Sequence, residues 1–162
     1  MAKERKKLIA GIILLIFFIS GILAWNFFQK NPTANKNLKE DTQAVGYNPN
    51  LKKPENFDSK QVALPGFSKI EVKEGETSAK IALSNPSFNN VYFKYTVKFN
   101  KTGEKLLETD LIAPGKAIKN LPLPKDLKQG KYSLIISIKT FDRKNKYELN
   151  GGSNEVPLIV NK

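Results

Sequence analysis

The stretch "VYFKYTVKFN", residues Val91 to Asn100, alternates apolar and polar side chains over most of its length. Its odd-numbered positions hold valine, phenylalanine and tyrosine, whereas lysine and threonine fill most of the even-numbered ones. A period of two residues is typical of a β-strand with one buried and one solvated face. This stretch therefore predicts a strand that turns its odd-numbered residues towards the core and its even-numbered residues, Tyr92 included, towards solvent.

Shorter stretches on both sides repeat this pattern between turn residues, which is typical of a β-sandwich. Ile81 and Leu83 are expected to be buried in the second strand, with Lys80 and Ala82 exposed, and Pro157 suits an edge strand. "NGG" at 150–152 is interpreted as a turn. We expect seven strands within residues 61–162, at 68–73, 78–84, 91–100, around 107–111, 117–121, 131–141 and 154–161.

The segment "LPLPKDLKQGKYSL" (121–134) resembles the tyrosine corner of immunoglobulin-like and fibronectin type III-like domains, on the residues Leu127, Gly130 and Tyr132. The resemblance implies a seven-stranded Ig-like β-sandwich, in which the Tyr132 hydroxyl donates a hydrogen bond to the backbone upstream. The disulfide and the core tryptophan of antibody domains are absent. The alternative is an ordinary turn followed by a core tyrosine.

Residues 8–28 carry no charge and include Trp25, Phe27 and Phe28 at their end. As a helix they would extend roughly 31 Å, which matches a bilayer core of about 30 Å. We expect one uncleaved N-terminal transmembrane helix; a cleaved signal peptide is the alternative, but no small-x-small cleavage site is present. Cations cluster in residues 1–7, so the positive-inside rule predicts a cytoplasmic basic tail and a C-terminal domain outside the cell membrane.

Residues 29–60 are rich in asparagine, lysine and proline and show no hydrophobic period. Such a composition predicts a disordered, flexible linker, because too little apolar surface is present to offset the entropy of ordering the chain. A coil of this length would hold its ends on the order of 30 Å apart. We therefore expect the folded domain to begin at about residue 61.

The chain contains no cysteine and no histidine, which removes thiolate nucleophiles, the usual zinc ligands and the commonest general base. Its net charge of +12 comes almost entirely from lysine. Lysine attracts polyanions but lacks the bidentate fork that reads base edges, so sequence-specific nucleic-acid binding is not expected. Anionic wall polymer is a conceivable partner; simple solvation of the surface is the alternative.

Two acidic clusters are the candidates for chemistry, one at Glu71, Glu74 and Glu76, the other at Glu104, Glu108 and Asp110. Paired carboxylates serve glycosidases, and three oxygen ligands can begin a calcium site. Lysines flank both clusters, which favours solvated charges. We therefore expect no enzyme activity, no cofactor and no metal.

A recognition surface is the better prospect. In an Ig-like sandwich the loops at 85–90 and 142–153 share one end of the domain. Their aromatic, arginine and amide side chains are typical of binding surfaces. The alternative is that Phe88 packs under its own loop and the asparagines only form turns. The predicted partner-binding residues are Asn85, Phe88, Asn89, Asn90, Arg143, Tyr147 and Asn150.

The whole layout resembles small single-pass membrane proteins of Gram-positive bacteria with one extracytoplasmic Ig-like domain, a group that is mostly uncharacterised. The segments that carry the resemblance are "LPGF" (64–67), "NPSFNNVYF" (85–93), "LIAPGKAI" (111–118) and "LNGG" (149–152). It implies a membrane-anchored, non-enzymatic binding or adaptor subunit of a cell-envelope, secretion or transfer assembly, with a protein partner at the cell surface. The alternative is a passive spacer that lysine charge holds to wall polymer.

Overall fold

The computed structural model describes residues 20–21, 37–58 and 60–162. Ser20 and Gly21 are helical and exposed. Within the described ranges, no helix has the length and apolar character needed to cross a bilayer. The predicted tail (1–7), most of the predicted transmembrane segment (8–28) and the first part of the predicted linker lie outside the described residues.

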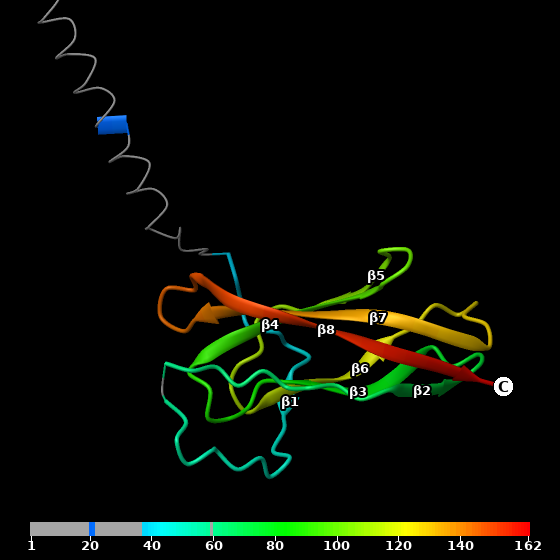
Figure 1. Cartoon of the computed structure of the whole chain (residues 1–162), viewed down its shortest axis with the longest axis horizontal. Coiled ribbons are helices and arrows are strands. Elements are labelled where there is room, and N and C mark those ends of the chain that lie inside the picture. Colours follow the sequence, from blue (N-terminus) through cyan, green and yellow to red (C-terminus); the bar gives the residue numbers. More distant parts are fainter. Residues whose placement is uncertain (1–19, 22–36, 59) are drawn as a thin grey trace, which may run out of the picture. The chain divides into compact units, whose positions relative to one another are not determined.

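The described chain from residue 37 is all-β, as predicted, and its strands form two sheets (Figure 1). One sheet has five strands in the order β2-β8-β7-β4-β5, and the other has three in the order β1-β6-β3. All pairs are antiparallel except β2 with β8. The strands are β1 (Val45–Gly46), β2 (Ile70–Lys73), β3 (Ser78–Ser84), β4 (Val91–Phe99), β5 (Lys105–Glu108), β6 (Lys116–Pro122), β7 (Gly130–Asp142) and β8 (Glu148–Asn161).

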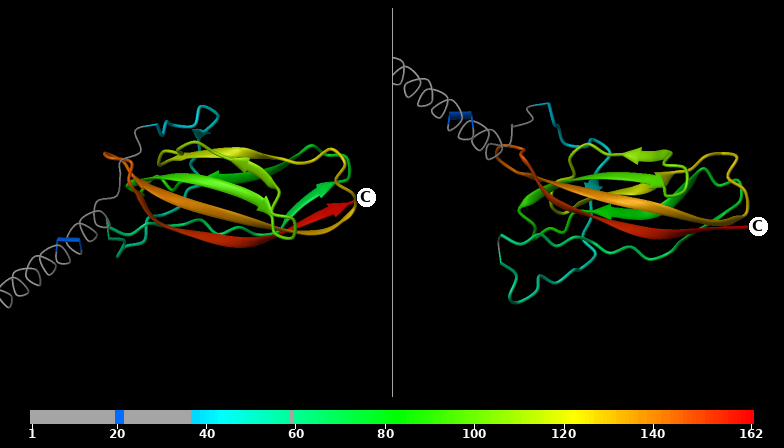
Figure 2. Two further views of the ribbon diagram at one scale, coloured as in Figure 1. Left: turned by 90° about the horizontal axis from the view of Figure 1, so that it is seen from above. Right: turned by 45° about the horizontal axis from the view of Figure 1, so that its top comes forward.

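The two sheets lie face to face, as Figure 2 shows from two further directions. They enclose the hydrophobic core. The odd-numbered side chains of β4 are buried there, as the alternation predicted. Residues of β7 and β8 join them from the same sheet, and Leu83, Ile118 and Leu121 come from the three-stranded sheet. Burial of this apolar surface is the main force that holds the sandwich together.

The structure corrects the boundary expected at residue 61. Residues 38–47, here called the strap, run along the sandwich and include β1, an eighth strand that the sequence did not predict. The Asp41 amide donates to the Leu111 carbonyl at 2.8 Å, and the Leu111 amide donates to the Lys39 carbonyl at 3.0 Å. The Tyr47 amide donates to the Gly115 carbonyl at 2.8 Å. The folded domain therefore includes a stretch that we expected in the linker.

The strap also explains why Tyr92 is buried, although the alternation placed it on the solvated face. Tyr92 packs with Leu111 and Phe141 in a second apolar cluster, against which Leu38 of the strap also packs. Its hydroxyl donates to Glu40 Oε1 at 2.9 Å. Burial and this hydrogen bond raise the pKa of Tyr92, and the same bond lowers the pKa of Glu40.

Two further expectations differ from the structure. The register of β3 shifts between Lys80 and Leu83, so that Ala79 and Leu83 are fully buried while Ile81 and Ala82 are only half-buried. A β-bulge of this kind interrupts the alternation of side chains between the two faces. Pro157 is not on an outermost strand, because β2 lies beyond β8, but β2 pairs with β8 only from Leu158 onward.

The predicted turn at 150–152 is part of a strand. β8 begins at Glu148, and its register against β7 shifts between Ile138 and Thr140. A Cβ atom at Gly151 would lie 2.1 Å from the Ile138 carbonyl oxygen, so only glycine fits this close approach of two backbones. The connection from β7 to β8 is therefore much shorter than the loop expected at 142–153.

Candidate functional site

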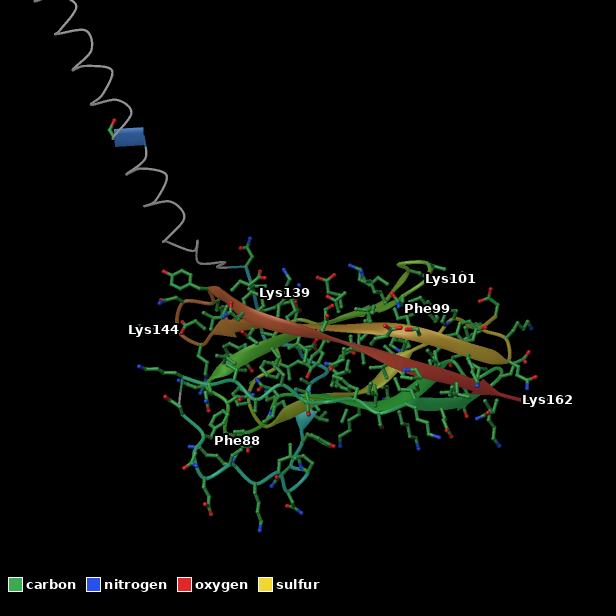
Figure 3. The ribbon with its side chains drawn as sticks, viewed as in Figure 1. Phe88, Phe99, Lys101, Lys139, Lys144 and Lys162 are labelled. Atoms are coloured by element: carbon green, nitrogen blue, oxygen red, sulfur yellow. The ribbon has the colours of Figure 1, made fainter. Side chains whose placement is uncertain are left out.

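The two predicted recognition loops do meet at one end of the sandwich, here called the loop end. Val91 at the start of β4 pairs with Asp142 at the end of β7, so the segments before and after these residues are neighbours. The opposite end, here called the hairpin end, carries the turn between β4 and β5. Figure 3 labels Phe88 at the loop end and Phe99 and Lys101 at the hairpin end.

Two of the predicted binding residues have structural partners instead. Asn85 is 1% exposed, and its Nδ2 donates to the carbonyls of Val91 at 2.8 Å and Ile112 at 2.9 Å. Asn89 is 4% exposed; its Nδ2 donates to Asn85 Oδ1 at 3.0 Å and to the Ala63 carbonyl at 3.0 Å, and its Oδ1 accepts from the Ala63 amide. These amides hold three backbone segments together and are not available to a partner.

The aromatic and basic residues of the loops are only partly accessible. Phe88 is half-buried and packs edge-on against Phe57, with 5.1 Å between ring centroids. Arg143 is exposed but lies over the ring of Tyr92, 6.0 Å from its centroid. Tyr147 is half-buried. The loop tips therefore expose Asn90 and Arg143, whereas Phe88 and Tyr147 are only partly accessible.

Asn150, the last predicted residue, lies in β8 and lines a groove that the sequence did not predict. This groove, here called the edge groove, has a volume of about 850 Å³ and lies between residues 60–64 and the start of β8. Leu64 and Leu149 line it and are 40% and 45% exposed. The other lining residues are Lys60, Val62, Thr140, Glu148 and Gly151. It combines exposed apolar side chains with the margin of a β-sheet.

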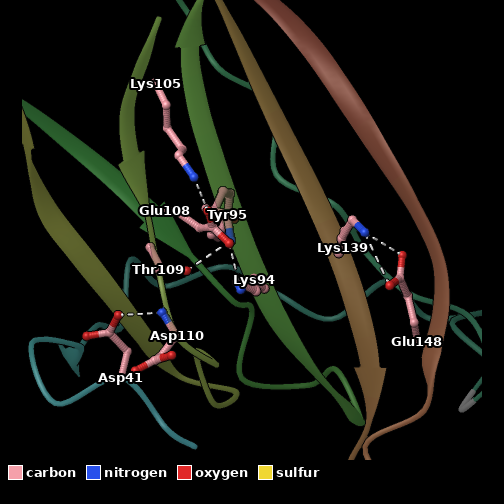
Figure 4. A network of polar contacts seen from close by, with 9 residues as sticks. All are labelled: Asp41, Lys94, Tyr95, Lys105, Glu108, Thr109, Asp110, Lys139 and Glu148. Carbon is pink, nitrogen blue, oxygen red and sulfur yellow. Dashed lines mark hydrogen bonds and ion pairs between the residues drawn. The ribbon is translucent and has the colours of Figure 1, made fainter. Parts of the chain in front are cut away.

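Several residues of the acidic clusters form ion pairs with lysines, and Figure 4 shows those of Glu108. Glu108 lies 2.8 Å from Lys94 Nζ and also contacts Lys105 Nζ. The hydrogen bonds from Lys105 and Lys94 lower the pKa of Glu108 to about 2. Asp110 lies 3.9 Å from Lys39, and Glu74 lies 3.4 Å from Lys128. In the part of the chain that the structure describes, no group of three acidic side chains is placed to hold a metal ion.

The hairpin end contains a second groove, of about 510 Å³, whose floor includes Phe99, Leu127 and Tyr132. The Tyr132 hydroxyl donates to the Lys128 carbonyl at 2.9 Å, which is the contact that a tyrosine corner requires. A Cβ atom at Gly130 would meet the Tyr132 ring at 3.5 Å. Leu127 packs against the core. Leu127 and Tyr132 are therefore engaged in holding the turn before β7.

The edge groove was missed because glycine and asparagine in "LNGG" (149–152) are usual turn residues. Leu149, between polar neighbours, is the clearest sequence signal near it, whereas Leu64 stands in the apolar stretch "VALPGF" (62–67). No protein-family model matches the chain, and comparison with curated proteins and with solved structures finds no significant match. The geometry of the described residues therefore carries the functional argument.

Proposed function

We propose that this protein is a non-enzymatic binding or adaptor protein, anchored in the cell membrane through residues 8–28, with its β-sandwich outside the cytoplasm. The observation that carries the binding role is the edge groove. Its volume lies within the range of known ligand sites, and two leucines in it are exposed. Exposed apolar residues beside polar ones are typical of surfaces that bind other proteins.

The proposed setting is an accessory subunit of a Gram-positive cell-envelope, secretion or transfer assembly. The resemblance to small single-pass proteins supports it, as does the charge-free segment after a basic N-terminus. The two packed sheets and the hydrogen bond from Tyr132 to Lys128 support an Ig-like topology for the domain. Folds of this kind serve many functions, so the binding role depends on the groove and not on the topology.

The double variant Leu64→Ser/Leu149→Ser tests this proposal. We expect crosslinking in intact cells, followed by purification through a C-terminal tag, to recover a protein partner with the wild type and at least about tenfold less with the variant. Leu51→Ser is the matched control, because Leu51 is 54% exposed and does not line the edge groove. Both variants should keep the thermal midpoint of the wild type within a few degrees.

Equal recovery of the partner by the double variant and the wild type would contradict the proposal. The triple variant Asn90→Ala/Arg143→Ala/Tyr147→Ala separates the groove from the loop tips, and we expect it to retain most of the partner. If only the triple variant fails to recover the partner, the binding site lies in the loops that the sequence predicted.

The passive spacer remains the second candidate because several lysines form no ion pair with a carboxylate of the described residues. Among the described residues, no carboxylate lies within 4.0 Å of the Lys101, Lys125 or Lys131 amino groups. A protein held to wall polymer by these charges would be released as the salt concentration rises, because salt screens exposed charges. It would also be retained equally by the leucine variant and the wild type.

A further inference from the structure

The strap is the first part of the folded domain that a pull on the N-terminal segment reaches. Strands β2 to β8 all follow it in the sequence, and the segment proposed as the membrane anchor precedes it. In the proposed function, the chain is anchored through residues 8–28 and holds a partner on β8. Tension between anchor and partner therefore passes through residues 38–47 before it reaches the rest of the sandwich.

The strap is attached to the sandwich at two separate points. At the first, Lys39–Asp41, two backbone hydrogen bonds join the strap to Leu111, and the Asp41 carboxylate accepts the Asp110 amide at 2.9 Å (Figure 4). At the second, Val45–Gly46, β1 pairs with two residues of β6. A pull from the N-terminal side loads the first point until it breaks and only then the second. The two points therefore do not share the load.

The other contacts of the strap are mostly polar and exposed. Glu40 accepts the Tyr92 hydroxyl and lies 3.3 Å from Lys116 Nζ, and the side chains of this ion pair are 45% and 40% exposed. Exposed ion pairs of this kind contribute little to stability. The apolar contacts come from Leu38 and Ala44, which are both only partly buried. Segments with few buried apolar contacts open at a lower free energy than a core does.

The C-terminal strand is held much more firmly. β8 pairs with β7 along most of its length and with β2 over Leu158–Asn161. Val156, Leu158 and Val160 are buried in the core between the two sheets. β8 can leave the sandwich only if these hydrogen bonds and core contacts break. A pull on both ends of the described domain therefore opens the strap first.

We propose that the strap is a latch that tension releases, so that residues 38–47 detach while the rest of the sandwich stays folded. The inference rests on the proposed function, which supplies the tension. Release adds about ten residues to the tether, or roughly 35 Å of extended chain, and uncovers Tyr92 and Leu111. The strap closes again when the tension falls, because its covalent link keeps it at a high effective concentration. The anchored protein thereby lengthens under load without unfolding β8.

Pulling on single molecules tests the proposal. The chain contains no cysteine, so the full chain with Lys36→Cys/Lys162→Cys, in a nonionic detergent, has just two attachment points for an optical trap. We expect two opening steps. The first occurs at the lower force, lengthens the chain by on the order of 30 Å and reverses when the force is lowered. The second unfolds the sandwich.

Moving one attachment point identifies the strap as the source of the first step. With Asn48→Cys in place of Lys36→Cys, the strap no longer carries the load, and the first step should be lost. In the Lys36→Cys/Lys162→Cys chain, Asp41→Ala should lower the force of the first step and leave the second unchanged, because it removes the acceptor of the Asp110 amide. Asp126→Ala, at an exposed site of the hairpin end, is the matched control and should change neither step.

Opening in a single step from positions 36 and 162 would overturn the latch, and so would a first step that persists from positions 48 and 162. Neither result bears on the binding function, because the measurement needs no partner. Conversely, a tagged wild type that recovers no partner from intact cells contradicts the binding function, whereas the latch is overturned only by the pulling results.

Discussion

Replacing Asn85 by alanine is expected to lower the free energy of unfolding by about 3 kcal/mol, and the thermal midpoint by on the order of 10 °C. The change removes donors to the buried Val91 and Ile112 carbonyls and the acceptor of the Asn89 amide. Each buried polar group left without a partner costs about 1–3 kcal/mol, and some of this cost is recovered by relaxation or entry of water. Unfolding in urea measures the loss.

Asn90→Ala is the matched control, because Asn90 lies in the same loop but is exposed. Its free energy of unfolding should stay within about 0.5 kcal/mol of the wild type. If Asn85→Ala unfolds at the same urea concentration as Asn90→Ala, Asn85 does not stabilise the fold. The prediction that it belongs to a binding surface would then be favoured again.

Removing the strap is the second change with a large expected effect. A chain that begins at residue 61 loses the backbone bonds of Asp41 and Tyr47 and uncovers Tyr92 and Leu111, whereas a chain that begins at residue 37 keeps them. The shorter chain also avoids the entropic cost of ordering the strap, which offsets part of the loss. We therefore expect its free energy of unfolding to be lower by on the order of 3 kcal/mol. Thermal unfolding of the two purified chains measures this difference.

Tyr92→Phe in the chain that begins at residue 37 separates the contributions of the strap. It removes only the hydrogen bond to Glu40 and should cost about 1 kcal/mol, well below the cost of the deletion. Equal thermal midpoints for the chains that begin at residues 37 and 61 would show that the strap does not stabilise the sandwich.

Periodicity predicted those parts of the fold in which one strand face is buried. β4 was located to within one residue, and the odd-numbered face of Val91–Phe99 is buried as expected. The strap has no hydrophobic period because it is held by backbone hydrogen bonds and by polar side chains such as Glu40 and Asp41. The composition of the strap therefore predicts a linker.

Residue type alone also did not predict the candidate site. The asparagines in the loop at 85–90 favour a binding surface by residue type, but a short amide side chain is equally suited to satisfying buried carbonyls, and Asn85 does so. The sequence "LNGG" favours a turn by residue type. The actual role of Gly151 is to let β8 approach the backbone of Ile138, and this contact is visible only in the fold. Only the fold shows that Leu64 and Leu149 lie in one groove.

Amide hydrogen exchange on the free and partner-bound protein tests the central claim, that β8 carries the binding site, most directly. In the free protein, the amides of Leu149–Gly151 that point away from β7 should exchange fast, whereas those of β4, which is paired on both sides, should exchange slowly. Binding should slow exchange in Leu149–Gly151 more than anywhere else in the sandwich. Protection confined to the hairpin end, or to the loop at 85–90, with β8 unchanged, would contradict it.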